Sequence, residues 1–197
     1  ADVNLEIISN HFETNKTQST LLVNGSKHII ESPLIGLFNV YNLAAAIGVV
    51  SRLGFQLNKV LRVVERLDGI PGRMEIVSTS NQPLVLVDYA HTPDALHKAL
   101  STICELPHDR IICVFGCGGD RDQEKRPVMG QIASENADFS YLTNDNPRNE
   151  SPDAIASMIL DGIRESNLEK VKVVLNREKA ISEAVSLSQI GDIVLIA

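Results

Sequence analysis

The sequence predicts an α/β protein whose larger part is a doubly wound, mostly parallel sheet, preceded by a smaller segment of strands and helices. Three observations lead to this prediction. After residue 72, short apolar runs alternate with helical patterns. Before residue 72, two period-two segments are followed by two helical patterns. Between the two parts, Ile70-Pro71-Gly72 is a cluster of residues that break helices and strands. Strands that are apolar on both faces and alternate with helices are typical of a parallel sheet covered on both sides.

Residues 1–36 are expected to form short strands, because segments 4–9 and 19–23 alternate roughly at period two and Asn24-Gly25 is a hairpin signal. A helix is expected over residues 39–53, which are small and apolar and precede Gly54. A second helix is expected from about Asn58 to Gly69. Its apolar face consists of Val60, Leu61, Val64 and Leu67.

The second part is expected to contain the strands 74–78, 84–88, 111–115, 139–143, 171–175 and 193–197. Its expected helices cover about 93–104, 126–136, 152–164 and 178–188. Right-handed crossovers between parallel strands then give an open, Rossmann-like sheet. Strand 74–78 joins the next strand through a tight turn, so it is expected to be the antiparallel one.

The composition narrows the class of protein. The 197 residues are 44% hydrophobic and 22% charged, which is ordinary for a globular protein and excludes a disordered or collagen-like chain. A net charge of -7 argues against a nucleic-acid partner. Three cysteines are too few for a disulfide framework, and no segment reads as a signal peptide or a membrane-inserted helix. We therefore expect a cytoplasmic protein.

The two ends of the chain suggest a piece of a longer protein. The sequence stops on the apolar strand 193–197 with no helix after it, and it begins within what reads as the middle of a sheet. The alternative is that residues 193–197 form a natural edge strand at a true terminus.

Polar clusters follow three successive strands of the expected parallel sheet. They occupy residues 88–94, 116–122 and 144–148. Ligands of such sheets bind beyond the carboxyl ends of the strands, so we expect one crevice fed by all three clusters. The glycines of 116–119 would let backbone approach a ligand, although tight strand-to-helix turns also use glycine.

Individual side chains in these clusters have both a binding and a structural interpretation. Asp88 could accept hydrogen bonds from ribose hydroxyls and His91 could donate to phosphate oxygens, or Asp88 could merely cap the turn before Pro93. Asp120 and Asp122 could bind a cation or fix a nearby arginine, or they could be solvated loop carboxylates.

Four cations concentrate positive charge in this acidic chain, namely Arg121, Lys125, Arg126 and Arg148. This suits an anionic ligand, because arginine recognises carboxylates in a bidentate manner and Pro147 stiffens the turn before Arg148. For Lys125 and Arg126 the alternative is a solvated first turn of a helix. Cys113 and Cys117 have no second Cys or His pair at zinc spacing, so we expect no metal site.

Five ordered motifs carry a resemblance to a known family. They are Gly36-Leu37-Phe38-Asn39-Val40-Tyr41-Asn42-Leu43-Ala44-Ala45, Pro71-Gly72-Arg73-Met74-Glu75, Asp88-Tyr89-Ala90-His91-Thr92-Pro93-Asp94, Gly116-Cys117-Gly118-Gly119-Asp120-Arg121-Asp122 with Lys125-Arg126-Pro127, and Asp145-Asn146-Pro147-Arg148. Together they resemble the Mur ligases, and within them the MurE type, the UDP-N-acetylmuramoyl-tripeptide synthetases. The resemblance implies that residues 1–70 end the family's central ATPase domain and that 71–197 form most of its C-terminal Rossmann-like domain.

The resemblance also implies an activity and assigns residues to it. Such enzymes use ATP and Mg²⁺ to join an amino acid to a UDP-N-acetylmuramoyl peptide through an acyl phosphate, as a step of peptidoglycan synthesis. Asn42, Arg73, Asp88 and His91 would then contact the nucleotide. Residues 145–148 resemble the signature for meso-diaminopimelate, whose distal end would be held by Arg121, Asp145, Asn146 and Arg148. No catalytic residue and no metal ligand of the family falls within the chain.

The family's phosphate loop, carbamylated lysine and UDP-binding domain correspond to sequence before residue 1, and a Gly-Lys-Gly-His-Glu segment would follow Ala197. We therefore expect the 197-residue chain alone to be inactive. Two alternatives stay open. One is a related ligase for another amino acid or for folate polyglutamylation, and the other is a free-standing nucleotide- or amino-acid-binding domain without catalysis.

Overall fold

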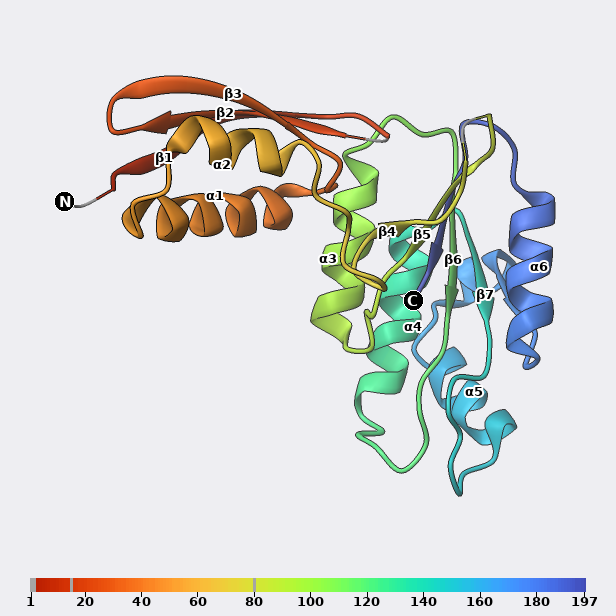
Figure 1. The fold of residues 1–197 in the computed structure, drawn as a ribbon. Helices are drawn as coiled ribbons and strands as arrows, with labels where there is room; N and C mark the ends of the chain where they lie inside the picture. The colour runs from red at the N-terminus through yellow and green to blue at the C-terminus, as the bar shows by residue number, and fades with distance from the viewer. Residues whose placement is uncertain (1–2, 15, 80) are drawn as a thin grey trace. The chain divides into compact units, whose positions relative to one another are not determined.

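The chain folds into two compact units, residues 1–70 and 71–197, in a computed structural model that describes residues 3–14, 16–79 and 81–197 (Figure 1). The predicted α/β class is confirmed, with one mostly parallel sheet and one antiparallel pair within it. No helix among the described residues is long and apolar enough to cross a bilayer.

The first unit contains a three-stranded antiparallel sheet in the order β1-β2-β3. Its strands are β1 (Leu5–Phe12), β2 (Thr17–Val23) and β3 (Ser26–Ser32). The predicted hairpin turn lies between β2 and β3, where Asn24 and Gly25 have φ values of 49° and 81°. Two left-handed residues in succession give a turn whose twist matches that of the strands it joins.

Two helices pack on this sheet, α1 (Leu37–Arg52) and α2 (Leu57–Val64). They share one core with the strands, made of Leu21, Val23, Ile30, Leu43, Ile47 and Val64. The expectation that the second helix reaches Gly69 is wrong. After Val64 the helical hydrogen bonds give way to shorter-range ones, from Arg66 N to Val63 O and from Leu67 N to Val64 O. Leu67 lies beyond the helix but still packs against the core.

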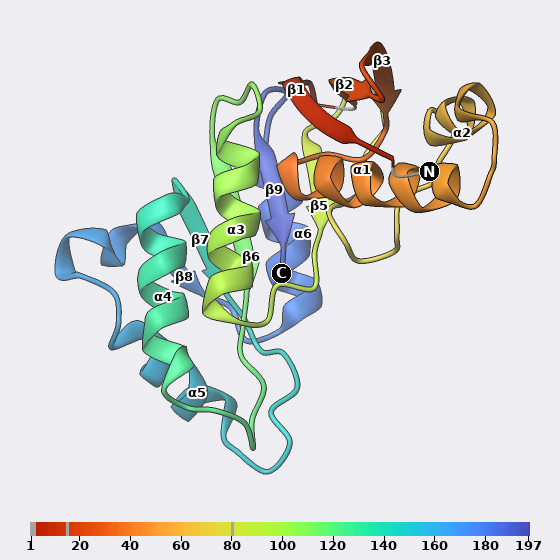
Figure 2. The ribbon, with the colours of Figure 1, turned by 90° about the vertical axis from the view of Figure 1, so that its left-hand side faces the viewer.

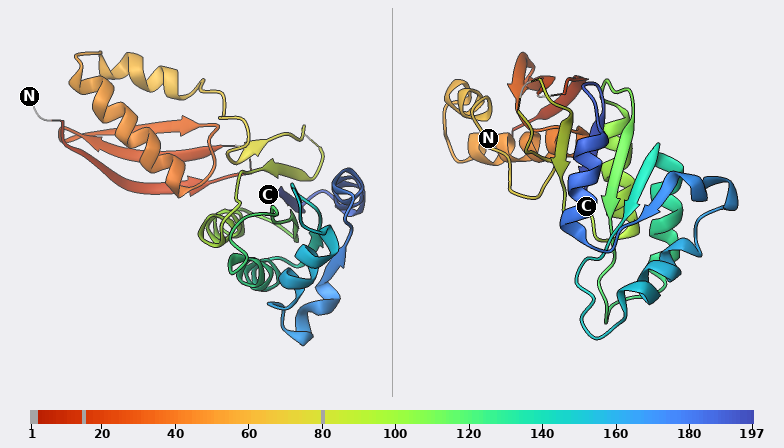
Figure 3. Two further views of the ribbon diagram at one scale, coloured as in Figure 1. Left: turned by 90° about the horizontal axis from the view of Figure 1, so that it is seen from below. Right: turned by 90° about the vertical axis from the view of Figure 1, so that its right-hand side faces the viewer.

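The second unit is built on a six-stranded sheet in the order β4-β5-β9-β6-β7-β8 (Figures 2 and 3). The strands are β4 (Glu75–Ile76), β5 (Leu84–Val87), β6 (Ile111–Phe115), β7 (Phe139–Leu142), β8 (Val171–Val173) and β9 (Ile193–Ile196). As predicted, β4 is antiparallel to its neighbour, and the other pairs are parallel. The last strand, β9, lies between β5 and β6, so the alternative that it is an edge strand is wrong.

Helices cover both faces of this sheet. They are α3 (Pro93–Cys104), α4 (Lys125–Asn136), α5 (Pro152–Leu160) and α6 (Arg177–Leu187). Helix α4 packs between α3 and α5, whereas α6 lies against the opposite face of β6, β7 and β9 (Figures 1 and 2). Alternate strand residues, including Val114, Tyr141 and Val194, form the core under α6. This arrangement leaves the carboxyl ends of the strands open for a site.

Some predicted elements are shorter than the sequence suggested. Helix α5 ends at Leu160 rather than near residue 164. Gly162, just after it, lies so close to Pro127 that a Cβ there would collide with the Pro127 carbonyl group. A short 3-10 helix (Glu165–Lys170) follows. Strand β4 has two residues rather than five. At its start, Met74 has a φ of 46°, which breaks extended pairing there.

Candidate functional site

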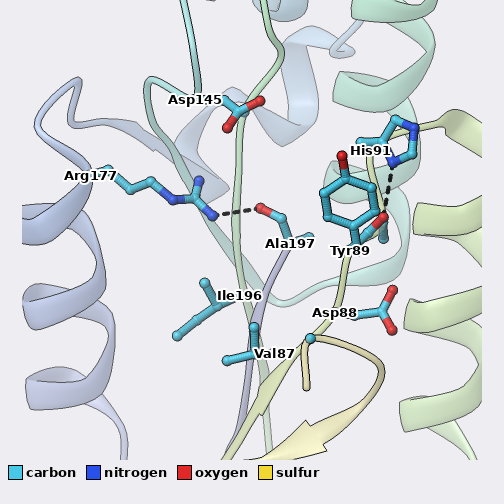
Figure 4. A pocket seen from close by; sticks show the side chains of 11 residues that line it. Val87, Asp88, Tyr89, His91, Asp145, Arg177, Ile196 and Ala197 are labelled. Atoms are coloured by element: carbon cyan, nitrogen blue, oxygen red, sulfur yellow. Dashed lines mark hydrogen bonds between the residues drawn. The ribbon is translucent and has the colours of Figure 1, made fainter. Parts of the chain in front are cut away.

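A cavity of about 190 Å³ opens at the carboxyl edge of the parallel sheet (Figure 4). All three predicted polar clusters contribute to its walls. The lining residues are Gly72, Val87, Asp88, Tyr89, Ala90, His91, Gly116, Asp145, Arg177, Ile196 and Ala197. The strands β5, β6, β7 and β9 all end at this edge, which is where parallel α/β sheets bind ligands.

Asp88, directly after β5, is half-buried beside the cavity and holds a fixed orientation. Its Oδ2 accepts a hydrogen bond from the backbone N–H of Met74 at 2.9 Å. Burial raises the pKa of the Asp88 carboxyl, while the Met74 N–H and the charge of Arg73 act against that rise. The structural part of the alternative is also present, because Asp88 accepts from a turn N–H and Pro93 begins α3, with Thr92 as the N-cap that accepts from Ala95 N.

Tyr89 brings two of the predicted nucleotide residues together. The guanidinium carbon of Arg73 lies 5.2 Å from the centroid of the Tyr89 ring, and the His91 and Tyr89 ring centroids are 4.6 Å apart. His91 Nδ1 donates to the Tyr89 carbonyl oxygen at 3.0 Å (Figure 4). Tyr89 is 61% exposed, so a cation, an aromatic ring and an imidazole form one accessible surface. The fourth predicted nucleotide residue, Asn42, is exposed on α1 of the first unit.

The predicted amino-acid residues lie on the two loops that follow β6 and β7. Asp145 lines the cavity, and Arg121 is exposed without a hydrogen bond or ion pair to any described residue. Arg148 Nη1 donates to the Gly119 carbonyl oxygen at 2.6 Å, and the Asn146 carbonyl accepts from Gly119 N at 2.8 Å. The loops therefore meet backbone to backbone, and the remaining N–H groups of the Arg148 guanidinium are not used in this contact.

The two first-turn cations of α4 have different environments. Arg126 has no exposed surface, so the alternative of a solvated residue is wrong for it. Its guanidinium binds both carboxylate oxygens of Glu150, at 2.7 and 2.8 Å. Lys125 is partly exposed, and its Nζ donates to the carbonyl oxygen of His91 at 2.7 Å.

Two residues of the site were missed by sequence reasoning. Glu150 stands only two positions after the predicted signature, where an acidic loop residue usually reads as solvated. Arg177 begins α6 and lines the cavity, where its Nη2 donates to the Ala197 carbonyl oxygen at 2.9 Å (Figure 4). Its buried Nη1 has no hydrogen-bond partner among the described residues. No local motif could have revealed Arg177, since its neighbours in the cavity lie far away in the sequence.

The loop carboxylates bind protein groups. Asp120 Oδ2 accepts from Asn149 Nδ2 at 2.7 Å, and Asp122 Oδ1 accepts from Glu124 N at 2.9 Å. Within the described ranges, no three His, Cys, Asp or Glu side chains come together in a way that could hold a metal ion. Cys113 and Cys117 are buried, and Cys117 Sγ lies 3.6 Å from Met129 Sδ.

Comparisons with known proteins agree with this arrangement. The family described as "Mur ligase, glutamate ligase domain" matches residues 72–197. The UDP-N-acetylmuramoyl-L-alanyl-D-glutamate–2,6-diaminopimelate ligase of Coxiella burnetii is 48% identical over 84% of this chain and 34% of its own length. A solved structure of a ligase with the same name superposes with a TM-score of 0.73 at 38% identity, over 100% of this chain and 40% of that one.

A more distant structure shares the fold. The MurF ligase of Thermotoga maritima, solved in complex with ADP, has a TM-score of 0.71 at 18% identity over 98% of this chain and 42% of its own. The chain spans about a third of the length of the curated relatives that it matches. Because the family match covers more than half of the residues, the chain belongs to the Mur ligase family.

Proposed function

We propose that this chain is part of an ATP-dependent ligase that joins meso-diaminopimelate to UDP-N-acetylmuramoyl-L-alanyl-D-glutamate. The observation that carries the proposal is the Asp145-Asn146-Pro147-Arg148 turn, packed on the glycine loop 116–119 in a chain that is 48% identical to a ligase named for this reaction. In this proposal the first unit is the end of the central ATPase domain and the second unit is the C-terminal domain.

Meso-diaminopimelate carries a carboxylate and an amine at its distal end, and lysine carries only the amine. A guanidinium that recognises the extra carboxylate would separate the two. Arg148 and Arg121 lie on adjacent loops and keep N–H groups available, and Asp145 supplies a negative charge for the distal ammonium. The arrangement supports selection of meso-diaminopimelate, which has a distal carboxylate, over lysine, which has none.

The nucleotide would lie on the β5 side of the cavity. Asp88 is fixed by the Met74 N–H and can accept from ribose hydroxyls. Arg73 and His91, both beside the Tyr89 ring, can approach phosphate oxygens. For Asn42, on α1 of the first unit, the nucleotide role rests on the family resemblance alone. The described residues provide no set of Mg²⁺ ligands, so no role of the metal is assigned to this chain.

The proposal is tested with the full-length protein that contains this chain. Purified protein, ATP, Mg²⁺ and UDP-N-acetylmuramoyl-L-alanyl-D-glutamate are incubated with meso-diaminopimelate, L-lysine or L-glutamate. The product and the released phosphate are then measured. Product with meso-diaminopimelate alone supports the proposal, whereas product only with another amino acid assigns the protein to a different ligase. Nucleotide binding with no product from any amino acid supports a binding domain without catalysis.

A further inference from the structure

Arg126 occupies a position where a buried cation is costly. It lies in the first turn of α4, where the helix dipole is positive and no acidic residue is present. It has no exposed surface, and a buried charge is tolerated only when it is paired and hydrogen-bonded. Its Nη1 and Nη2 donate to the two carboxylate oxygens of Glu150, and Nη2 also approaches the Gly118 carbonyl oxygen at 3.4 Å.

Glu150 extends this pair to the glycine loop. It accepts a hydrogen bond from the backbone N–H of Asp120, and its Oε2 accepts from Gln123 Nε2 at 3.3 Å. Arg126 holds the pKa of Glu150 down to about 2, with the Asp120 N–H as the next contribution. The Glu150 carboxylate, in the loop after β7, therefore binds both the loop after β6 and the start of α4.

The two loops are held in strained backbone conformations at this junction. Asp120 and Arg148 have φ values of 51° and 50°, which side chains other than glycine rarely adopt. A Cβ at Gly119 would collide with the carbonyl oxygen of Pro147, so the loops touch at backbone level. Strain of this kind persists only where the surrounding contacts determine the conformation.

We propose that the Arg126–Glu150 ion pair is the positioning element that holds the turn 145–150 against the glycine loop, and so aims the Arg148 guanidinium at the distal carboxylate of the amino-acid substrate. This inference rests on the proposed function for the identity of the ligand. It assigns no contact with substrate to either member of the pair. Glu150 is a positioning residue that acts through Arg148, whose Nη1 is anchored on the Gly119 carbonyl oxygen.

The same unit provides a matched control. Arg110 and Asp192 form a second bidentate pair, in which Arg110 Nε donates to Asp192 Oδ1 at 3.1 Å and Nη2 donates to Oδ2. These residues precede β6 and β9, so they lie at the amino edge of the sheet, opposite to the cavity. Asp192→Asn should disturb a bidentate arginine–carboxylate pair, here with a half-exposed arginine, without reaching the turn 145–150.

The first measurement is backbone hydrogen exchange in the 197-residue chain. Glu150→Gln should speed exchange at Gly119 and Glu150, whose N–H groups bond to Asn146 O and Pro147 O. Asp192→Asn should speed exchange near residues 109 and 192 and leave those two amides unchanged. Unchanged exchange at Gly119 and Glu150 in Glu150→Gln would overturn the positioning role, whatever substrate the protein uses.

The second measurement is steady-state kinetics of the full-length protein. Glu150→Gln should raise KM for meso-diaminopimelate by about 10- to 100-fold, since a small misplacement of a binding group has effects of this size. KM for ATP should change by less than about twofold. Glu150→Asp, which keeps the charge, should recover part of the loss. Asp192→Asn should leave both KM values unchanged.

A third variant separates positioning from stability. Arg126→Met/Glu150→Gln removes the unpaired buried charge, so it should be more stable than Glu150→Gln alone, yet KM for meso-diaminopimelate should stay high. A return of KM to the wild-type value in this double variant would overturn the inference. A wild-type protein that joins no diaminopimelate would instead overturn the proposed function and the ligand named here, while hydrogen exchange still decides the positioning role.

Discussion

Lys125 and His91 are joined across two neighbouring loops: the Nζ of Lys125 donates to the backbone carbonyl oxygen of His91 at 2.7 Å. Lys125 begins α4, which follows the glycine loop, and His91 belongs to the loop after β5 that we propose to bind the nucleotide. This bond connects the proposed nucleotide side of the cavity to the element that carries Arg126. Lys125 and Arg126, which are adjacent in α4, therefore bind the loop after β5 and the loop after β7, respectively.

Replacement of Lys125 should affect the nucleotide more than the amino acid. Lys125→Met removes the donor to His91 O, and we expect KM for ATP in the full-length protein to rise about three- to tenfold, a modest value because the lysine is partly exposed. Lys98→Met is the control, since Lys98 pairs with the exposed Asp94 on α3 and does not line the cavity. Equal effects of the two variants would contradict the role given to Lys125.

Two glycine-to-alanine substitutions should have opposite effects on stability. Gly119→Ala would place a Cβ against the Pro147 carbonyl oxygen, so the loops must separate and the second unit should lose about 1–3 kcal/mol. At Gly48, within α1, an added Cβ would meet no described atom within 4 Å apart from its chain neighbours and the adjoining helix backbone. The higher helix propensity of alanine should therefore stabilise the first unit by up to about 1 kcal/mol in Gly48→Ala. Urea unfolding of both variants measures these changes.

The stability of the chain should depend on pH through Glu150. Because Arg126 lowers the pKa of Glu150 from 4.5 to about 2, the folded state binds this proton less readily than the unfolded state. The contribution is fully present above about pH 4.5 and is lost as the pH falls towards about 2. Denaturant unfolding across this range should show the difference between wild type and Glu150→Gln shrinking on acidification. A difference independent of pH would contradict the ionised pair.

The three thiols should differ in reactivity. Burial raises the pKa of all three thiols, to about 12 for Cys113 and to about 11 for Cys117, but Cys104 is exposed and the other two are buried. Since the thiolate is the reactive form, an aromatic disulfide reagent at neutral pH should modify one thiol of the native chain and the other two only after unfolding. Cys104→Ser should abolish the native-state reaction. Rapid modification of Cys117 would show that the glycine loop opens.

Much of the fold was predictable because its signals are local. Thr92 and Pro93 begin α3 by side-chain capping and a fixed φ, and Asn24-Gly25 makes the hairpin turn, so each is determined by adjacent residues. The position of β9 was not predictable. Its insertion between β5 and β6 depends on pairing with strands that lie about 80 and 110 residues earlier in the sequence, which no local pattern specifies.

The site was predictable only in part, for the same reason. The carboxyl edge of a parallel sheet gathers residues 88–91, Gly116 and Asp145, and sequence reasoning can anticipate that edge. The burial of Arg126 could not be anticipated, because its partner lies 24 residues later on another loop. Arg177 was missed because its place in the cavity depends on how α6 packs on the sheet.

The measurement that tests the central claim most directly is kcat/KM for meso-diaminopimelate and for L-lysine in the full-length protein, wild type against Arg148→Ala. Loss of a charge-assisted hydrogen bond of about 1.5–3 kcal/mol should lower kcat/KM for meso-diaminopimelate by about 10- to 150-fold, and Arg148→Lys should recover only part. The value for lysine should fall much less, because lysine has no distal carboxylate to lose, and KM for ATP should hardly change. Equal losses for both amino acids, or a higher KM for ATP with unchanged diaminopimelate kinetics, would contradict the account.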